Sequence, residues 1–156
     1  MRKLAAVLGT VFFLMLTFAC VFYFGGTLKP QVRITTADAA DYPEAFSAAK
    51  AIVDGGSAPQ SFTSVALGAA AQYTLVDVNI TLANRGFSPA EWLDIRVEPA
   101  AGDVAVYSLT GEGSTLPGRS MDLVNLKLIT TARADAARAY CIQYYIYGMK
   151  REIEIQ

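Results

Sequence analysis

The chain has 156 residues, 13 of them lysine or arginine and 14 aspartate or glutamate, and this length fits one domain rather than two. Charged residues make up 17% of the chain and its mean hydropathy is +0.33, which is too apolar for an ordinary soluble domain, so part of the chain is expected to lie outside water. The chain contains no histidine, which excludes Ser-His-Asp and Cys-His catalysis and every zinc site that uses a histidine ligand.

The apolar excess is concentrated near the N-terminus, where residues 4–24 (LAAVLGTVFFLMLTFACVFYF) carry no charge. As a helix rising about 1.5 Å per residue, this segment spans roughly 31 Å, which matches the hydrocarbon core of a bilayer at about 30 Å. Arg2 and Lys3 precede the segment, and Lys29 is the first charge after it. The positive-inside rule therefore places residues 1–3 in the cytoplasm and the rest of the chain outside, behind a single transmembrane helix or uncleaved signal anchor over residues 4–24.

Two other fates of the apolar segment remain open. A cleaved signal peptide needs a small-x-small site, and the best match, Ala37-Asp38-Ala39, lies well beyond the apolar run. A lipoprotein would use residues 16–20 (LTFAC), which loosely resemble a lipobox ending at Cys20. We favour the anchor because the apolar run is longer than the 7–15 residues of a usual signal peptide.

The remainder of the chain is mildly acidic and poor in cysteine. Without Arg2 and Lys3, 11 basic residues stand against 14 acidic ones, a net charge of −3, which argues against nucleic acid as a partner. Cys20 lies in the apolar segment and Cys141 in a predicted strand, so we expect no disulfide within the chain. We interpret Cys141 as a buried small hydrophobic residue rather than a nucleophile, since the chain has no histidine to activate it.

A linker, a strand and a helix are predicted next. Residues 25–30 (GGTLKP) combine paired glycines with a proline and are typical of a linker, after which a domain over residues 31–156 begins. Residues 31–35 alternate in polarity and predict a first strand. Asp41 as N-cap and Glu44 three residues later form a capping-box pattern, which predicts a short helix over residues 42–54.

From Gln60 onward apolar residues recur at every second position, which indicates strands. We expect strands over residues 61–67, 72–83, 92–98, 104–109, 121–130, 140–147 and 151–155. With the first strand this makes about eight short strands separated by turns. The pattern is typical of an all-β fold, an antiparallel β-sandwich of about seven to eight strands with one short helix.

Two turn motifs carry a family resemblance. Asn84-Arg85-Gly86 follows one strand, and residues 116–120 (LPGRS) open another. Over residues 72–155 this order resembles bacterial immunoglobulin-like, cell-adhesion-related (CARDB-like) domains, and the start near Pro30 after an anchor is similar to the LEA14-like (WHy) sandwich. The resemblance implies a binding or spacer module rather than an enzyme, and it assigns no functional residue.

Carboxylates on the predicted strands have two interpretations. Asp77 is expected to face Arg96 across a hairpin, with Asp94 nearby. Carboxylates on adjacent strands are what a glycosidase or a metal site requires. We favour the other interpretation, a solvated sheet face with cross-strand charge pairs.

Tyrosines gather in one predicted strand. Alternation places Tyr140 and Tyr144 on one face and Tyr145 and Tyr147 on the other. A two-layer sandwich exposes one side of each sheet, so one pair is expected to be exposed, and Trp92 falls on the outward side of its own strand. Tyr145, Tyr147 and Trp92 are therefore a candidate face for a protein or glycan partner, with ordinary sheet packing as the alternative.

Taken together, these patterns predict a non-catalytic, membrane-anchored, extracytoplasmic binding or assembly module of the bacterial cell envelope, without cofactor or metal ion. Its expected partners are the membrane, through residues 4–24, and an envelope protein or glycan. The alternative is a small envelope enzyme that acts on glycans through paired carboxylates. Such an enzyme would have a deep pocket lined by at least two of the acids Asp77, Asp94, Glu98, Asp103 and Asp122.

Overall fold

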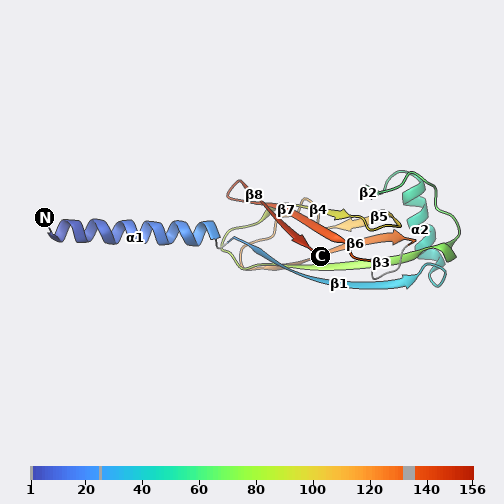
Figure 1. Ribbon diagram of the computed structural model, residues 1–156, viewed down its shortest axis with the longest axis horizontal. Coiled ribbons are helices and arrows are strands. Elements are labelled where there is room, and N and C mark those ends of the chain that lie inside the picture. The colour runs from blue at the N-terminus through green and yellow to red at the C-terminus, as the bar shows by residue number, and fades with distance from the viewer. Residues whose placement is uncertain (1, 25, 132–135) are drawn as a thin grey trace.

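The computed structural model describes residues 2–24, 26–131 and 136–156 of the chain. A long helix is followed by an elongated domain made mostly of strands (Figure 1). In chain order the elements are α1 (Arg2–Phe24), β1 (Leu28–Asp38), α2 (Pro43–Asp54), β2 (Gln60–Ser61), the short 3-10 helix η1 (Ala70–Gln72), β3 (Thr74–Asn84), β4 (Glu91–Glu98), β5 (Asp103–Thr110), β6 (Met121–Thr130), β7 (Ala139–Ile146) and β8 (Met149–Ile155).

Helix α1 confirms the expected apolar helix near the N-terminus. Its segment Lys3–Cys20 is long and apolar enough to cross a membrane by length and composition, and none of it is buried against the rest of the chain. The hydroxyls of Thr10 and Thr17 donate hydrogen bonds to the carbonyl oxygens of Ala6 and Phe13, one turn earlier in each case. These polar groups are therefore satisfied within the helix, as an apolar environment requires.

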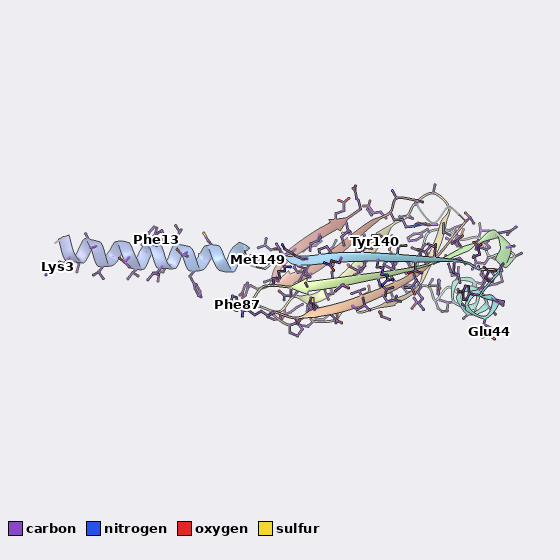
Figure 2. All side chains as sticks on the ribbon, turned by 90° about the horizontal axis from the view of Figure 1, so that it is seen from below. Lys3, Phe13, Glu44, Phe87, Tyr140 and Met149 are labelled. Atoms are coloured by element: carbon purple, nitrogen blue, oxygen red, sulfur yellow. The ribbon has the colours of Figure 1, made fainter. Side chains whose placement is uncertain are left out.

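The strands form two antiparallel sheets. One has five strands in the order β1-β3-β6-β5-β2, and the other has three in the order β4-β7-β8. Helix α2 lies at the end of the domain far from α1 (Figure 1). Glu44 marks this distal end in Figure 2, whereas Phe87 and Met149 lie at the opposite, proximal end beside α1.

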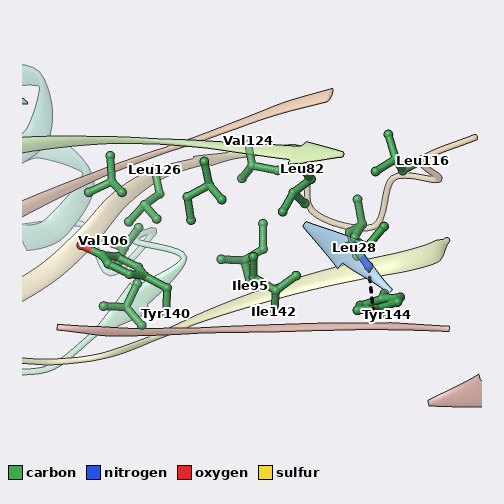
Figure 3. Packing of buried hydrophobic residues seen from close by; sticks show 14 of the residues in the cluster. Leu28, Leu82, Ile95, Val106, Leu116, Val124, Leu126, Tyr140, Ile142 and Tyr144 are labelled. Carbon is green, nitrogen blue, oxygen red and sulfur yellow. Dashed lines mark hydrogen bonds between the residues drawn. The ribbon is translucent and has the colours of Figure 1, made fainter. Parts of the chain in front are cut away.

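The main core lies between the two sheets. Leu82 and Val124 of the five-stranded sheet face Ile95 and Ile142 of the three-stranded sheet, all of them buried (Figure 3). Their positions follow the period of two that the sequence shows in β3, β4 and β7. Each such side chain stabilises the fold by roughly 1.5–3 kcal/mol relative to full exposure.

A second cluster attaches α2 to the five-stranded sheet. Phe46 of α2 is buried beside Leu75, Val104 and Ile129, which come from β3, β5 and β6. Its ring also stacks on Tyr73, with 5.7 Å between the ring centroids. The helix is therefore a fixed part of the domain.

The predicted linker over residues 25–30 is too long, because β1 begins at Leu28 rather than at residue 31. Leu28 is buried, and its backbone N–H donates a hydrogen bond to the hydroxyl of Tyr144, 3.3 Å away. Pro30 is accommodated because β1 is an edge strand, where a missing N–H is tolerated. Only residues 25–27 separate α1 from β1.

The predicted capping box of α2 is wrong, although the helix itself is confirmed. The N-cap is Tyr42, which makes no side-chain capping hydrogen bond, and the helix begins at Pro43. The backbone N–H of Asp41 instead donates to the carbonyl oxygen of Asp38, in the turn that leaves β1. This turn shifts Asp41 out of the N-cap position.

The strand predicted over residues 61–67 is also wrong, because β2 contains only Gln60 and Ser61. The N–H of Leu67 donates to Asp54 of α2 at 2.9 Å, and Lys50 donates to the Leu67 carbonyl oxygen. These contacts with α2 replace strand pairing in this segment. The other strands after β2 begin and end within two residues of their predicted positions.

Candidate functional site

Trp92 and Tyr145 lie together on the outer side of the three-stranded sheet. Tyr145 of β7 is opposite Glu91 of β4, and the register of this pairing shifts between Glu91 and Asp94. Trp92 lies in this irregularity with a φ of 55°, a conformation that non-glycine residues seldom adopt. A bulge redirects side chains, and the indole here is 70% exposed.

The two aromatic side chains line one shallow cavity of about 420 Å³, together with Glu91 and Gly148. Gly148 has a φ of 72° and supplies the tight β7–β8 turn without adding a side chain to the cavity. The cavity thus offers two aromatic surfaces and one carboxylate. This combination suits a planar or apolar group that carries a hydroxyl or a positive charge.

Tyr147 is exposed as expected, but it does not line the cavity. It lies in the β7–β8 turn with a φ of 54° and is 49% exposed. The hydroxyl of Ser88, in the β3–β4 loop, donates a hydrogen bond to the Tyr147 hydroxyl. The structure therefore brings together two of the three residues predicted for the partner face, and Tyr147 lies in the neighbouring turn without lining the cavity.

The two turn motifs meet at the proximal end. Asn84 is 1% exposed, and its side-chain amide donates to the carbonyl oxygens of Ser88 at 2.8 Å and Leu116 at 3.3 Å. Its side-chain oxygen accepts a hydrogen bond from the N–H of Gly86 at 3.0 Å. One buried side chain therefore joins the β3–β4 loop to the β5–β6 loop.

This junction holds Phe87 in an exposed position. A Cβ atom at Gly118 would overlap the carbonyl group of Phe87, so the two loops pack backbone to backbone. The guanidinium of Arg119 lies 4.0 Å from the centroid of the Phe87 ring, a cation–π contact. The ring is nevertheless 70% exposed. Sequence reasoning missed Phe87, although an aromatic residue directly after a turn motif was a visible signal.

The expected pairing of Asp77 with Arg96 is wrong. Asp77 lies in β3 and Arg96 in β4, and these strands belong to different sheets. Arg96 instead pairs with Asp94 on its own strand, with 3.0 Å between the charged atoms. Asp77 accepts hydrogen bonds from Asn79 and Asn125 on the outer side of β3 and β6. The chain passes from one sheet to the other between β3 and β4, so these strands form no hairpin.

Asp103 forms a buried ion pair with Arg138. Its carboxylate accepts two hydrogen bonds from Arg138, at 2.9 and 2.7 Å, and a third from the N–H of Ala100 at 2.8 Å. The hydrogen bond to Asp103 raises the pKa of the Arg138 guanidinium, against the opposing effect of burial. Both charged side chains are at most 1% exposed. The pair ties the start of β5 to the segment that leads into β7.

Two of the acids weighed for catalysis, Asp77 and Asp103, line separate cavities. Asp77 lines a cavity beside α2, and Asp103 lines another beside Thr63 and Tyr73. Among residues 2–24, 26–131 and 136–156, no three Cys, Asp or Glu side chains gather where they could hold a metal ion.

The inward tyrosines are buried, as the alternation predicts, and they differ in hydrogen bonding. Tyr144 accepts the hydrogen bond from Leu28. The hydroxyl of Tyr140 is buried and has no hydrogen-bond partner in the described part of the chain, and burial is the main cause of its raised pKa. Tyr140 also lines a cavity of about 320 Å³ with Val32 and Ile155, between β1 and β8.

Cys141 is not the buried hydrophobic residue that we expected. It is partly exposed on the outer side of β7, and its thiol donates a hydrogen bond to a Glu152 carboxylate oxygen 3.1 Å away. Burial, followed by this hydrogen bond, raises the pKa of the thiol above its ordinary value. The raised pKa favours the thiol over the thiolate, which is the nucleophilic form of cysteine.

No model of a protein family matches the chain, and no curated protein shows significant sequence similarity to it. Function must therefore be argued from the geometry of the described residues.

Proposed function

We propose that the protein is a non-catalytic, membrane-anchored binding or assembly module of the bacterial cell envelope. Its anchor is α1, with the N-terminus in the cytoplasm and the β-rich domain outside. The length and composition of α1 support this arrangement, as do Arg2 and Lys3 at its start.

The immunoglobulin-like fold is part of the proposal and is supported by strand order. In the constant-type immunoglobulin fold, strands A, B, E and D form one sheet and C, F and G the other. Here β1-β3-β6-β5 and β4-β7-β8 follow the same order, with the two-residue β2 added at one edge. This agreement supports the CARDB-like resemblance of the two turn motifs, which implies a binding or spacer role.

The observation that carries the proposal is the exposure of Trp92 beside Tyr145. A non-glycine residue at positive φ costs of order 1 kcal/mol, and such strain is found preferentially at functional sites. Here the strained backbone holds the only tryptophan of the chain 70% exposed, over a cavity that it shares with Tyr145. Tryptophan and tyrosine dominate the energetics of protein interfaces. We assign this cavity to an envelope protein or glycan partner.

The geometry of Asp77, Asp94 and Asp103 supports the binding module over the enzymatic alternative. Paired-carboxylate hydrolysis of glycans needs two acids about 5–10 Å apart across one cleft. Asp77 and Asp103 line separate cavities, Asp94 is paired with Arg96, and Asp103 is neutralised by Arg138.

Photo-crosslinking in membranes tests the binding site. A photoreactive phenylalanine analogue placed at Tyr145 of the full chain is expected to yield a discrete crosslinked product, and Trp92→Ala in the same chain should reduce it at least tenfold. Tyr42, which is 55% exposed at the distal end, is the matched control position. Equal products from both positions, or a product that is insensitive to Trp92→Ala, would overturn the assignment. A glycan partner would appear as a carbohydrate-modified product.

Mass spectrometry of the chain extracted from membranes tests the anchor. An intact N-terminus in alkali-resistant membranes is expected. A mature chain that starts at Cys20, or near residue 40, would overturn the anchor.

A further inference from the structure

Exposed apolar side chains cluster at the proximal end of the domain. Outside α1, ten large apolar side chains of the described chain are exposed, and three of them, Ile34, Tyr42 and Val65, lie elsewhere. The other seven come from the strands and turns near the start of β1, namely Phe87, Trp92, Met121, Leu123, Tyr145, Tyr147 and Met149. Exposed apolar side chains concentrated at one end of a domain indicate a contact at that end.

The short connection to α1 keeps this end close to the helix. Four Cα–Cα steps join Phe24 to Leu28, so these Cα atoms are at most about 15 Å apart. Gly26 also packs against β7, because a Cβ atom at this position would lie 3.0 Å from Cδ1 of Ile146. Phe87 and Met149 lie beside the end of α1 (Figure 2).

We propose that the proximal tip, formed by Phe87, Arg119, Tyr147 and Met149, rests in the interfacial layer of the phospholipid bilayer that holds α1. This inference depends on the proposed membrane anchor. Phe87 and Met149 supply apolar surface, and Tyr147 adds a ring with a hydroxyl, as aromatic residues do at membrane interfaces. The Arg119 guanidinium beside Phe87 provides a partner for lipid phosphate.

The contact has a consequence for binding. With the tip in the interface, the neighbouring cavity of Trp92 and Tyr145 opens close to the membrane surface. A partner would then approach along the membrane rather than from the distal end, where α2 lies.

Tryptophan fluorescence tests the contact in the full chain. Because Trp92 is the only tryptophan, Trp92→Phe removes the background signal, and Phe87→Trp then reports on the tip. In vesicles of phosphatidylethanolamine and phosphatidylglycerol, lipids brominated near the top of the acyl chains should quench this signal at least twofold. The matched control is Tyr42→Trp in the same background, at the distal end, and it should not be quenched. An unquenched tryptophan at position 87 would overturn the contact.

Two further measurements separate the possible causes of failure. Flotation of the same vesicles reports the anchor: a chain that does not float overturns the proposed anchor, whereas a floating chain with an unquenched tip overturns only the lipid contact. Ten Gly/Ser residues inserted between Gly26 and Thr27 lengthen the tether. Quenching that persists supports affinity of the tip for lipid, and quenching that disappears shows that proximity alone produced it, which overturns the proposal.

Discussion

The side-chain amide of Asn84, at the end of β3, donates a hydrogen bond to the carbonyl oxygen of Leu116, 3.3 Å away in the β5–β6 loop. The same amide bonds to Ser88, and the side-chain oxygen accepts from Gly86. This side chain therefore reinforces the backbone bridge between Ala90 and Leu116, which joins two loops that are far apart in the sequence.

Asn84→Ala is expected to lower the free energy of unfolding by about 2–3 kcal/mol, because the Gly86 N–H and the Ser88 carbonyl lose this partner and the Leu116 carbonyl keeps only its bond from Ala90. Urea denaturation of the domain in detergent measures this change. Arg85→Ala, at the exposed neighbouring position, should stay within about 0.5 kcal/mol of the unmodified chain. Equal stability of the two variants would contradict this role for Asn84.

Arg138→Met should destabilise the domain by about 3–5 kcal/mol, because it leaves the Asp103 carboxylate buried without its counter-charge. The comparison is Arg96→Met, which breaks an exposed pair with Asp94 and should cost less than about 1 kcal/mol. Thermal unfolding of both variants gives the difference. If the two midpoints fall equally, burial of the Asp103–Arg138 pair has no energetic importance.

Tyr140→Phe and Tyr144→Phe should differ in their effect on the free energy of unfolding. The Tyr140 hydroxyl is buried without a partner in the described residues, so its removal should leave stability unchanged or raise it by up to about 1 kcal/mol. Tyr144→Phe removes the hydrogen bond from Leu28 and should cost roughly 0.5–1.5 kcal/mol. Chemical denaturation distinguishes the two, and a marked loss from Tyr140→Phe would show that its hydroxyl is bonded.

Cys141 should react slowly with iodoacetamide. Because its thiol pKa is raised, less thiolate is present at any pH below that pKa, and the midpoint of the rate–pH profile should lie above that of an ordinary cysteine. Glu152→Gln removes the carboxylate acceptor and should move the midpoint to lower pH. Both measurements use the Cys20→Ser background, in which Cys141 is the only thiol. A midpoint unaffected by Glu152→Gln would rule out the carboxylate as a cause.

Alternation of polarity predicted much of the fold because neighbouring residues of a strand point to opposite faces. It correctly predicted that Tyr140 and Tyr144 are buried and that Trp92 and Tyr145 are exposed. Alternation identifies a face but not the sheet to which a strand belongs. Asp77 and Arg96 were therefore paired wrongly, since β3 and β4 lie in different sheets.

The features that were missed depend on contacts between distant segments. The contacts of Leu67 with α2 replace the longer strand that was expected there. The linker is shorter than predicted because β1 already begins at Leu28, which is buried. The motifs at Asn84 and Leu116 lie at the end of one strand and before another, as predicted, but their meeting depends on the path of the whole chain. The bulge at Trp92 likewise has no local signal in the sequence.

The direct passage from α1 into β1 also determines how the domain carries mechanical force. With α1 held in a bilayer, a partner that pulls the domain away from the membrane draws β1 lengthwise past β3, its eleven-residue antiparallel neighbour. The hydrogen bonds between these strands lie perpendicular to that direction, so the whole ladder shares the load in shear. Separating the strands would require many bonds to break together rather than one after another. If α1 acts as the proposed anchor, β1 is thus placed to bear the tension that a partner of the domain would exert against it.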